Sequence, residues 1–319
     1  MSDLINELSN PQLLSVVAVI VVVCLERWLQ LPDSVHPLTF ARLIAQRMAY
    51  KVNARRPGDA LQQTIAGTLA PLVLLVPFLV VLMLLMYLAE FPLFFESLLL
   101  LVALRFEPII ALCKKIEKSL KQDKKTLARH QLQNIVLRKT ANLSSLGITK
   151  ACIESLLLRF NHQYCTVLMV YFVGGGITAI SYRLLFEFSQ CWHGRVSRFE
   201  YFAKPTRFIV ELIQWLPARL SGCCFILMQN FAMAWRAFKS RANQHNTRYF
   251  ILNLQGAALN VQLSGPIYYA QQKLNLPKCG GSKLATIEDI SRVIGAVRNT
   301  QWVFLSLYLI LSLLVNRGG

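Results

Sequence analysis

Acidic residues are scarce in this sequence. The 319 residues hold 16 Asp and Glu against 34 Lys and Arg, which gives a net charge of +18, and only 16% of all residues are charged. In a soluble protein this excess of positive charge would suggest a nucleic-acid partner. Because 55% of the residues are hydrophobic, well above soluble averages, a membrane explains the charge better, and we expect no nucleic acid.

Short motifs of common chemistry are also missing. The eight cysteines form no C-x-x-C pair, which leaves no framework for zinc or disulfides and makes buried thiols the default interpretation. H-E-x-x-H, G-x-S-x-G and glycine-rich phosphate loops are absent, and the glycines at 174–176 lack a following Lys-Ser/Thr. We therefore expect no metal site and no generic catalytic motif.

Long apolar runs are what the sequence has in excess. The run from Ile65 to Leu88 contains no charge and exceeds the roughly 20 residues that cross a bilayer; a buried soluble helix is the alternative. Pro71 and Pro77 inside it are tolerated in transmembrane helices. Further candidate spans lie at 13–25, 93–113, 164–182, 208–235 and 302–315. These runs predict an all-α, polytopic membrane protein with about five or six spans in a single domain, 1–319.

Two of the candidate spans are irregular. Residues 164–182 carry three consecutive glycines, each weakening a helix by about 1 kcal/mol relative to alanine, which predicts a broken or re-entrant helix. Residues 208–235 form either one kinked span or two packed helices around Pro217. Glu211 and Arg219 should face a protein interior and pair, because a charge at membrane depth costs about 2.5–3.5 kcal/mol.

Basic residues gather in three connecting segments, 27–64, 114–163 and 236–300. Because positive charge is retained on the cytoplasmic side, these segments should lie inside a bacterial inner membrane. The acidic N-terminus, where no cleavable leader is apparent, and the turn at 89–96 then lie outside. Residues 183–207 strain the rule, because they are basic and should also face outward.

Two of the basic segments have a predicted structure. In the first, four apolar residues near helical spacing predict an amphipathic helix at the membrane surface: Phe40, Leu43, Ile44 and Met48. The second, from Lys114 to Phe160, is expected to be a solvated helical loop.

Several local phrases occur in a fixed order: HPLTFARLI (36–44), TLARHQLQNIVLRKT (126–140), ACIES (151–155), ISYR (180–183), WLPARLSG (215–222), VQLSGPIYY (261–269) and IEDISRVI (287–294). The series resembles the CobD/CbiB family of cobalamin-biosynthesis membrane proteins, from Glu26 to Arg298. Members are described as adenosylcobinamide-phosphate synthases, which join adenosylcobyric acid to aminopropanol, usually its O-phosphate. The resemblance implies ATP and Mg²⁺ as cofactors, those two substrates, the lipid bilayer, and contacts with other membrane proteins of cobalamin assembly.

The sequence departs from the family pattern at several positions, most of them acidic in the family. Lys139 replaces an aspartate between Arg138 and Thr140, and Glu154 is retained. The remaining changes fall at Leu158-Arg159, His162-Gln163, Phe186–Gln190 and His245–Thr247. Because magnesium prefers carboxylate ligands, a catalytically inactive relative is the alternative, and it is left open whether the chain is an enzyme.

A weaker resemblance is to AmpE, an inner-membrane protein linked to the signalling of β-lactamase induction. CLERWLQL (24–31) and WLPARLSG are similar to its counterparts, whereas GPIYY and EDISR favour the cobalamin branch. An AmpE-like regulatory or sensor protein is therefore the competing function.

The candidate catalytic residues are Glu154 and Glu211. Glu154 would bind a metal or orient a substrate amine, and an ordinary solvated glutamate is the alternative. Arg138 with Thr140 is the preferred contact for a phosphate or carboxylate, because guanidinium forks suit oxyanions. The other candidate substrate-binding residues are Arg129, Arg183, Arg219, His36, Gly265, Pro266 and Tyr269.

Some of these candidates have structural alternatives. Arg129 would meet Arg138 only if the chain bends, because about two and a half helical turns separate them. His36 is expected to cap a turn. Gly265-Pro266 is interpreted first as a turn with aromatic anchors and second as a stacking surface for a corrinoid.

Overall fold

The chain forms two compact units, which are described separately. The computed structural model describes residues 11–29, 36–52, 60–136, 138–192, 199–229, 231–239, 246–269 and 272–317. Unit 1 comprises Met1–Arg105, Val167–Ile213 and Leu307–Gly319, and unit 2 comprises Phe106–Thr166 and Gln214–Ser306. The expectation of a single membrane domain over the whole chain stays a prediction.

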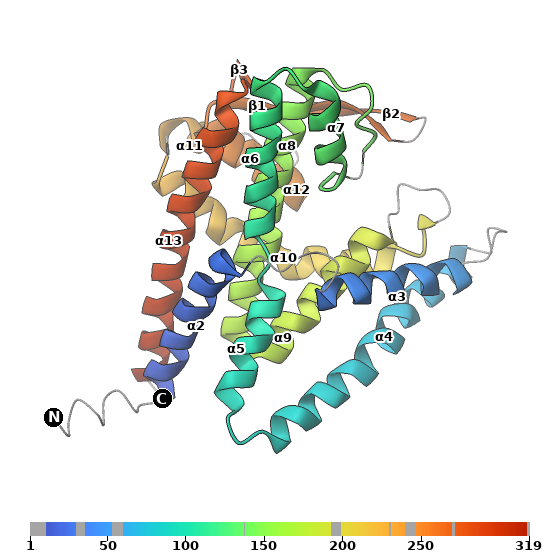
Figure 1. The fold of residues 1–319 in the computed structure, drawn as a ribbon, viewed down its shortest axis with the longest axis vertical. Coiled ribbons are helices and arrows are strands. Elements are labelled where there is room, and N and C mark those ends of the chain that lie inside the picture. The colour runs from blue at the N-terminus through green and yellow to red at the C-terminus, as the bar shows by residue number, and fades with distance from the viewer. Residues whose placement is uncertain are drawn as a thin grey trace. The chain divides into compact units, whose positions relative to one another are not determined.

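Unit 1 is built from helices (Figure 1). They are α2 (Pro11–Trp28), α3 (Pro37–Val52), α4 (Ala60–Leu88), α5 (Pro92–Ala103), most of α9 (Thr166–Cys191), the start of α10 (Lys204–Leu227) and the end of α13 (Glu288–Arg317). Helix α2 packs against α5. The indole Nε1 of Trp192, a buried residue, donates to the Ala45 carbonyl of α3 at 3.0 Å.

The helix predicted near 40–48 is confirmed as α3, and its place at the membrane surface stays a prediction. Its small residues Ala45 and Ala49 are buried, whereas Phe40 and Leu43 are exposed. His36 caps the start of the helix, because its Nδ1 accepts a hydrogen bond of 3.2 Å from the Leu38 N–H. The capping role expected for His36 is therefore confirmed.

The glycine-rich segment of α9 is broken, as predicted. Gly174 and Gly175 leave helical geometry, and Gly175 has φ 72°, a conformation that glycine adopts at low cost. The Thr178 hydroxyl lies 3.1 Å from the Val170 carbonyl oxygen and 2.8 Å from that of Gly175, so it satisfies carbonyls that the break releases.

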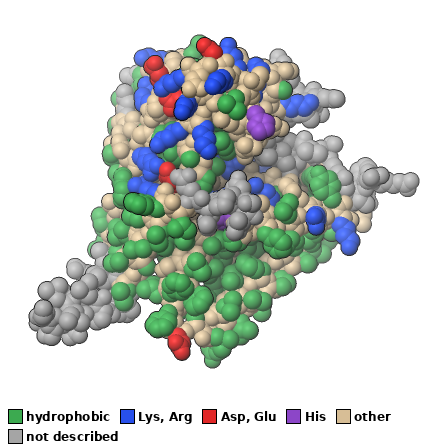
Figure 2. Space-filling view, in the orientation of Figure 1, with side chains coloured by type: hydrophobic (Ala, Val, Ile, Leu, Met, Phe, Trp, Pro, Cys, Tyr) green, Lys and Arg blue, Asp and Glu red, His purple; other side chains and the backbone are tan. Residues whose placement is uncertain are grey.

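Unit 2 combines helices with a small sheet. Its helices are α6 (Glu107–Lys121), α7 (Lys125–Gln133), α8 (Ser145–Arg159), the π-helical turn η1 (Phe160–Cys165), the end of α10, α11 (Phe231–Lys239), α12 (Thr247–Ala258) and the start of α13. Tilted or stacked rings of Phe106, Phe160 and Tyr164 lie in its core. Figure 2 shows Lys and Arg side chains over α6 and α7 of this unit, and hydrophobic side chains over α4 and α5 of unit 1.

The structure is mostly helical, as predicted, but a three-stranded sheet in unit 2 corrects the all-α class. Strands β1 (Val261–Tyr269) and β2 (Gln272–Gly280) pair antiparallel, and β3 (Lys283–Leu284) pairs parallel with β1. Gly265 and Pro266 lie within β1 at a register shift, not in the predicted turn. A bulge explains this placement, because it tolerates a proline that donates no hydrogen bond and a glycine with positive φ, here 117°.

Four helical segments among the described residues are long and apolar enough to cross a membrane. They are Ala60–Leu88, Ser145–Cys191, Lys204–Leu227 and Glu288–Ser312. This pattern suggests a multi-pass membrane protein. Helix α2 forms where a first span is expected, and its crossing of a membrane stays a prediction. The cytoplasmic location of the basic segments also stays a prediction. The acidic N-terminus and residues 193–198 of the predicted outward segment 183–207 lie outside the described residues.

Three other predictions are corrected or resolved by these helices. The run at 93–113 is divided between α5 and α6, because the chain leaves helical geometry at 104–106. The segment 114–160 is mainly helical, as predicted, and exposed on one side, but it is packed and not a free loop, since Ile116, Leu132 and Leu156 are buried. The run at 208–235 is two helices, α10 and α11, and Pro217 lies inside α10.

The close approach at Gly67 gives a stability prediction. A Cβ on Gly67 would overlap the backbone of Phe202, whereas a Cβ on Gly295, also inside a helix, meets nothing within 4 Å. We expect Gly67→Ala to destabilise the protein by about 1–3 kcal/mol, since overpacking forces the backbone apart. Gly295→Ala should stabilise it by about 0.5–1 kcal/mol through helix propensity.

Thermal unfolding in detergent, followed by circular dichroism, measures both glycine variants. The midpoint should fall for Gly67→Ala and rise slightly for Gly295→Ala. Equal midpoints would contradict the contact between Gly67 and Phe202.

Candidate functional site

Glu154 is a buried carboxylate on α8. This helix begins at the N-cap Ser144, whose side chain accepts from the Gly147 N–H at 3.2 Å. Most of the apolar residues of α8 are buried, including Ile153 and Leu157, which lie within one turn of Glu154. Glu154 itself is only 4% exposed, so its charge has to be balanced by protein groups. The alternative of a solvated glutamate is therefore wrong.

Three segments distant in sequence supply that balance. Glu154 Oε1 accepts a hydrogen bond of 2.8 Å from the Ser264 N–H. Glu154 Oε2 lies 3.4 Å from Arg138 Nη2 and 3.8 Å from Arg248 Nη2. The Arg138 side chain is 9% exposed and that of Arg248 is 32% exposed. One carboxylate is thus shared by two guanidinium groups, one buried and one reaching solvent.

Local structure explains how these partners reach Glu154. Arg138 lies in the connection between α7 and α8, and Arg248 lies in the first turn of α12, where the Asn246 side chain accepts from the Arg248 N–H at 3.0 Å. Ser264 has φ 59° at the bulge of β1. A positive φ is costly for serine, and the bulge directs its N–H to the carboxylate.

Two lysines add to the positive charge around Glu154. Lys150 lies one turn earlier on α8 and its Nζ is 3.4 Å from Gln262 Oε1 of β1. Lys278 of β2 is the register partner of Ser264 and lies within electrostatic range of Lys150. We call Glu154, Arg138, Arg248, Lys150, Lys278 and Ser264 the Glu154 cluster.

Cys279 lies beside this cluster, and the charged groups of the cluster affect the pKa of its thiol. Burial raises the pKa of the Cys279 thiol to about 12, and the nearby negative charge of Glu154 adds to the shift. Arg248 and Lys150 act in the opposite direction. Because the thiolate is the reactive form of cysteine, Cys279 should be an inert thiol near neutral pH.

The donor groups of the cluster match phosphate better than magnesium. Guanidinium and ammonium groups suit the phosphates of ATP. Magnesium prefers several oxygen ligands such as carboxylates, and Glu154 is the single carboxylate of the cluster. Among the described residues, no group of three or more His, Cys, Asp and Glu could hold a metal ion. The donor groups therefore suit phosphate groups and do not suit a magnesium ion.

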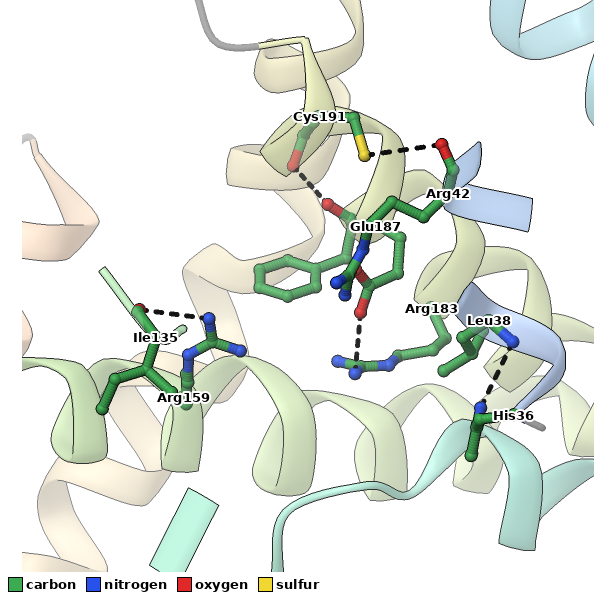
Figure 3. Close-up of polar contacts among 10 residues, drawn as sticks. His36, Leu38, Arg42, Ile135, Arg159, Arg183, Glu187 and Cys191 are labelled. Atoms are coloured by element: carbon green, nitrogen blue, oxygen red, sulfur yellow. Dashed lines mark hydrogen bonds and ion pairs between the residues drawn. The ribbon is translucent and has the colours of Figure 1, made fainter. Parts of the chain in front are cut away.

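A second buried acid lies in unit 1. Glu187 of α9 is 2% exposed, its Oε1 lies 2.8 Å from Arg183 Nη2, and Arg42 of α3 bonds its Oε2. Figure 3 shows both guanidinium groups directed toward this carboxylate. Arg183 was predicted to bind substrate, and the structure gives it a protein carboxylate as partner; its substrate role stays a prediction.

Other predicted residues have structural partners. Arg129 Nε donates to the Leu143 carbonyl at 2.9 Å. Thr140 is buried, and its carbonyl accepts from the Leu143 N–H at 3.1 Å. The bend between α7 and α8 thus holds both residues, and no hydrogen bond among the described residues joins Arg129 to Arg138. Their roles in substrate binding stay predictions.

The expected pair of Glu211 and Arg219 does not form. Glu211 Oε1 accepts from Arg207 Nε at 2.8 Å in an exposed pair. The Arg219 guanidinium lies 3.8 Å from the ring centroid of Trp215 and bonds the Trp215 carbonyl at 2.9 Å. Each charge therefore has a neighbour one helical turn away, which local geometry favours.

The remaining predicted residues lie on β1 or at the start of α3. Gly265 and Pro266 lie next to Ser264 at the bulge, and Tyr269 ends the strand opposite Gln272. The side chains of Pro266 and Tyr269 lie outside those that the structure describes. Stacking of a corrinoid on this strand stays a prediction, as does a ligand role for His36.

Sequence reasoning missed Arg248, Lys150 and Glu187. Lys150 and Glu154 are four residues apart on a helix, a spacing that was available as a signal. Arg248 follows directly after Asn246 and Thr247, where the sequence departs from the family pattern. Glu187 follows Arg183 at the same helical spacing. Nothing local connects Ser264 with Glu154, 110 residues away.

Comparisons with known proteins agree on one family. The family model described as CobD/Cbib protein matches residues 19–297. The cobalamin biosynthesis protein CobD of Chromobacterium violaceum is 28% identical over 299 residues, which cover 92% of this chain and 95% of that protein. The protein of the same name from Stutzerimonas stutzeri is 26% identical over 188 residues, 58% of this chain and 61% of that protein. No solved structure matches.

Removal of the buried charge of Glu154 should destabilise unit 2. In Glu154→Gln, Arg138 would keep a buried charge without its carboxylate, which costs about 3 kcal/mol. Glu117→Gln is the matched control, because Glu117 is also buried but its partner Lys121, at 2.7 Å, is 55% exposed. Lys121 can return to water, so this change should cost clearly less than Glu154→Gln.

Unfolding midpoints of the two variants, measured in the same detergent, check this difference. A Glu154→Gln variant as stable as Glu117→Gln would show that Arg138 does not depend on the carboxylate.

The pH dependence of alkylation tests the environment of Cys279. With a pKa of about 12, the thiolate fraction should rise about tenfold per pH unit from pH 8 to 11, whereas an ordinary cysteine levels off above about 9. Glu154→Gln should speed the reaction at fixed pH, because it removes a negative charge, and Arg248→Gln should slow it. Peptide-resolved mass spectrometry after iodoacetamide treatment measures the rate, and a plateau near pH 9 would refute the shift.

Proposed function

This chain belongs to the CobD/CbiB family, and on that premise we propose that it acts in cobalamin biosynthesis as an adenosylcobinamide-phosphate synthase-like enzyme. The reaction would form an amide bond between a carboxylate of adenosylcobyric acid and the amine of aminopropanol or its phosphate. The observation that supports this proposal is the buried Glu154 shared by Arg138 and Arg248. A cluster with more cations than acids suits the anionic substrates and the nucleotide of such a reaction.

The residues of the Glu154 cluster have separate roles in this proposal. ATP, when bound, supplies the activation of the corrinoid carboxylate. Arg138 and Arg248 hold an oxyanion by charge-assisted hydrogen bonds, and Glu154 keeps the two guanidinium groups in place. As the cluster's single carboxylate, Glu154 also orients the amine that attacks the activated carbonyl, which is a gain from proximity and alignment.

The proposed location is a bacterial inner membrane with the Glu154 cluster on the cytoplasmic side. The four apolar helices support a multi-pass arrangement. Residues of the cluster lie within or beside the basic segments 114–163 and 236–300, which the charge bias assigns to the cytoplasm. ATP would be available on that side.

An assay of the purified protein tests the proposed function. The protein in lipid nanodiscs is given adenosylcobyric acid, aminopropanol phosphate, ATP and magnesium, and the amide product is detected by mass spectrometry. Glu154→Gln and Arg138→Gln should lower kcat/KM about tenfold or more, since a hydrogen bond to a charged group contributes about 1.5–3 kcal/mol. Lys121→Gln, which removes an exposed charge in the same unit, should retain the wild-type rate.

No amide product, under conditions in which a relative from the same family forms one, would contradict the enzymatic proposal. That result would favour the non-catalytic membrane protein.

A further inference from the structure

We propose that the junction of α10, α11 and α12 in unit 2 binds an anionic phospholipid, with Arg219 on the headgroup phosphate and the aromatic face of α11 in the headgroup layer of the membrane. This surface shares no residue with the Glu154 cluster. The inference goes beyond the proposed function, because lipid binding requires no turnover.

Arg219 is a charge inside an apolar helix. It belongs to α10, one of the helices that could cross a membrane, and lies eight residues before the helix ends at Leu227, which is about 12 Å of helix. In the part of the chain that the structure describes, Arg219 contacts the Trp215 carbonyl and two aromatic rings but no carboxylate. A charge at membrane depth requires a partner, and a long basic side chain near a helix end can extend to the headgroups.

Two rings hold the Arg219 guanidinium in position. Its Cζ atom lies 3.8 Å from the ring centroid of Trp215 and 5.2 Å from that of Phe250. Stacking orients the planar group without using its N–H donors. Of the five donors that a guanidinium carries, one bonds the Trp215 carbonyl. The described residues leave the others able to bind phosphate oxygens, whose geometry a guanidinium fork matches.

The aromatic face of α11 continues this surface. Phe231, Trp235 and Phe238 follow one another on one side of the helix, with 5.7 Å between the ring centroids of each successive pair and nearly parallel rings. These residues are 54%, 45% and 44% exposed. The ring of Phe238 also meets that of Phe250 at 6.4 Å, so the rings of α11 extend to the neighbour of Arg219. Apolar side chains exposed together mark a membrane or partner surface.

Continuity with α10 favours lipid as the occupant. Only residues 228–230 separate the end of α10 from the start of α11, so α11 begins at the membrane surface when α10 crosses. On α10, Trp215, Leu216 and Leu227 are 49%, 48% and 71% exposed, as expected of side chains that face hydrocarbon. Tryptophan is enriched at the level of the headgroups, and helices with an aromatic face lie in that layer.

Charge favours an anionic lipid over a second copy of the chain. A two-fold contact through this face would bring Arg219 toward the same residue of the other copy, and like charges that face each other repel. The segment 236–300, which begins within α11, is one of the basic segments of a chain with net charge +18. Basic segments beside membrane spans attract anionic headgroups.

Thermal unfolding of the full chain in detergent tests the lipid site. Phosphatidylglycerol should raise the unfolding midpoint by about 2–4 °C more than phosphatidylcholine at the same mole fraction, because a ligand of the folded state stabilises it. Arg219→Gln should lose most of this difference, Trp235→Ala should reduce it, and Arg219→Lys should retain part of it through its charge. Inorganic phosphate should give no shift, since it has no acyl chains to cover the aromatic face.

Arg207→Gln is the matched control for the loss of a charge on α10. Arg207 lies on the same helix in an exposed pair with Glu211. Its removal should leave the difference between the two lipids unchanged.

Fluorescence quenching tests where the aromatic face lies. In nanodiscs that hold one protein each, phosphatidylglycerol brominated near the headgroup end of its acyl chains should quench Trp235, and iodide in the water should not. The difference in quenching between the wild type and Trp235→Phe isolates the signal of Trp235 from that of the other tryptophans.

Several results would overturn the inference. They are equal shifts with the two lipids, an unchanged shift in folded Arg219→Gln, and quenching of Trp235 by iodide but not by brominated lipid. A shift with inorganic phosphate alone would assign Arg219 to a soluble anion. Protection of Trp235 only in nanodiscs that hold two copies would assign the face to a second copy, and either result would refute the choice of lipid.

Discussion

A carboxylate that is almost completely removed from solvent sets the architecture of unit 2. Glu154 cannot stay charged at 4% exposure without close donors, and the donors come from three separate places. The connection after α7 brings Arg138, the first turn of α12 brings Arg248, and the bulge of β1 brings the Ser264 N–H. Contacts with Glu154 thus fix the positions of strand β1, the start of α12 and the connection after α7.

Unit 1 repeats the same arrangement around another acid. Glu187 is buried and shared by Arg42 and Arg183, on two different helices. With 34 basic and 16 acidic residues in the chain, each buried acid can have more than one cationic neighbour. The excess of positive charge that first suggested a membrane surface therefore also serves inside the units, and at Glu154 it remains larger than the acid can balance.

The sequence predicted the features that local pattern determines. The charge-free run from Ile65 to Leu88 predicted α4. The three glycines at 174–176 predicted the break in α9, and His36 before Pro37 indicated a cap. The sheet was missed because Gly265 and Pro266 are typical of turns, whereas here pairing with β2 across a bulge holds them in a strand. Tertiary pairing overrides local preference in such strands.

The candidate site was predictable only in part, for a related reason. Glu154 and Arg138 stood out by their type and by family resemblance, and the structure brings them together. Arg248 and Ser264 lie about a hundred residues further along the chain, and no spacing rule reaches that far. The pairing expected for Glu211 with Arg219 was wrong because each residue found a nearer partner on its own helix.

A double-mutant cycle between Glu154 and Arg138 measures the central interaction most directly. Unfolding free energies of Glu154→Gln, Arg138→Gln and the double variant give the coupling between the two charges. The structure predicts a coupling of about 1.5–3 kcal/mol, because a buried charge loses its partner in each single variant but not in the double variant. A coupling below about 0.5 kcal/mol, as for an exposed pair, would contradict the account.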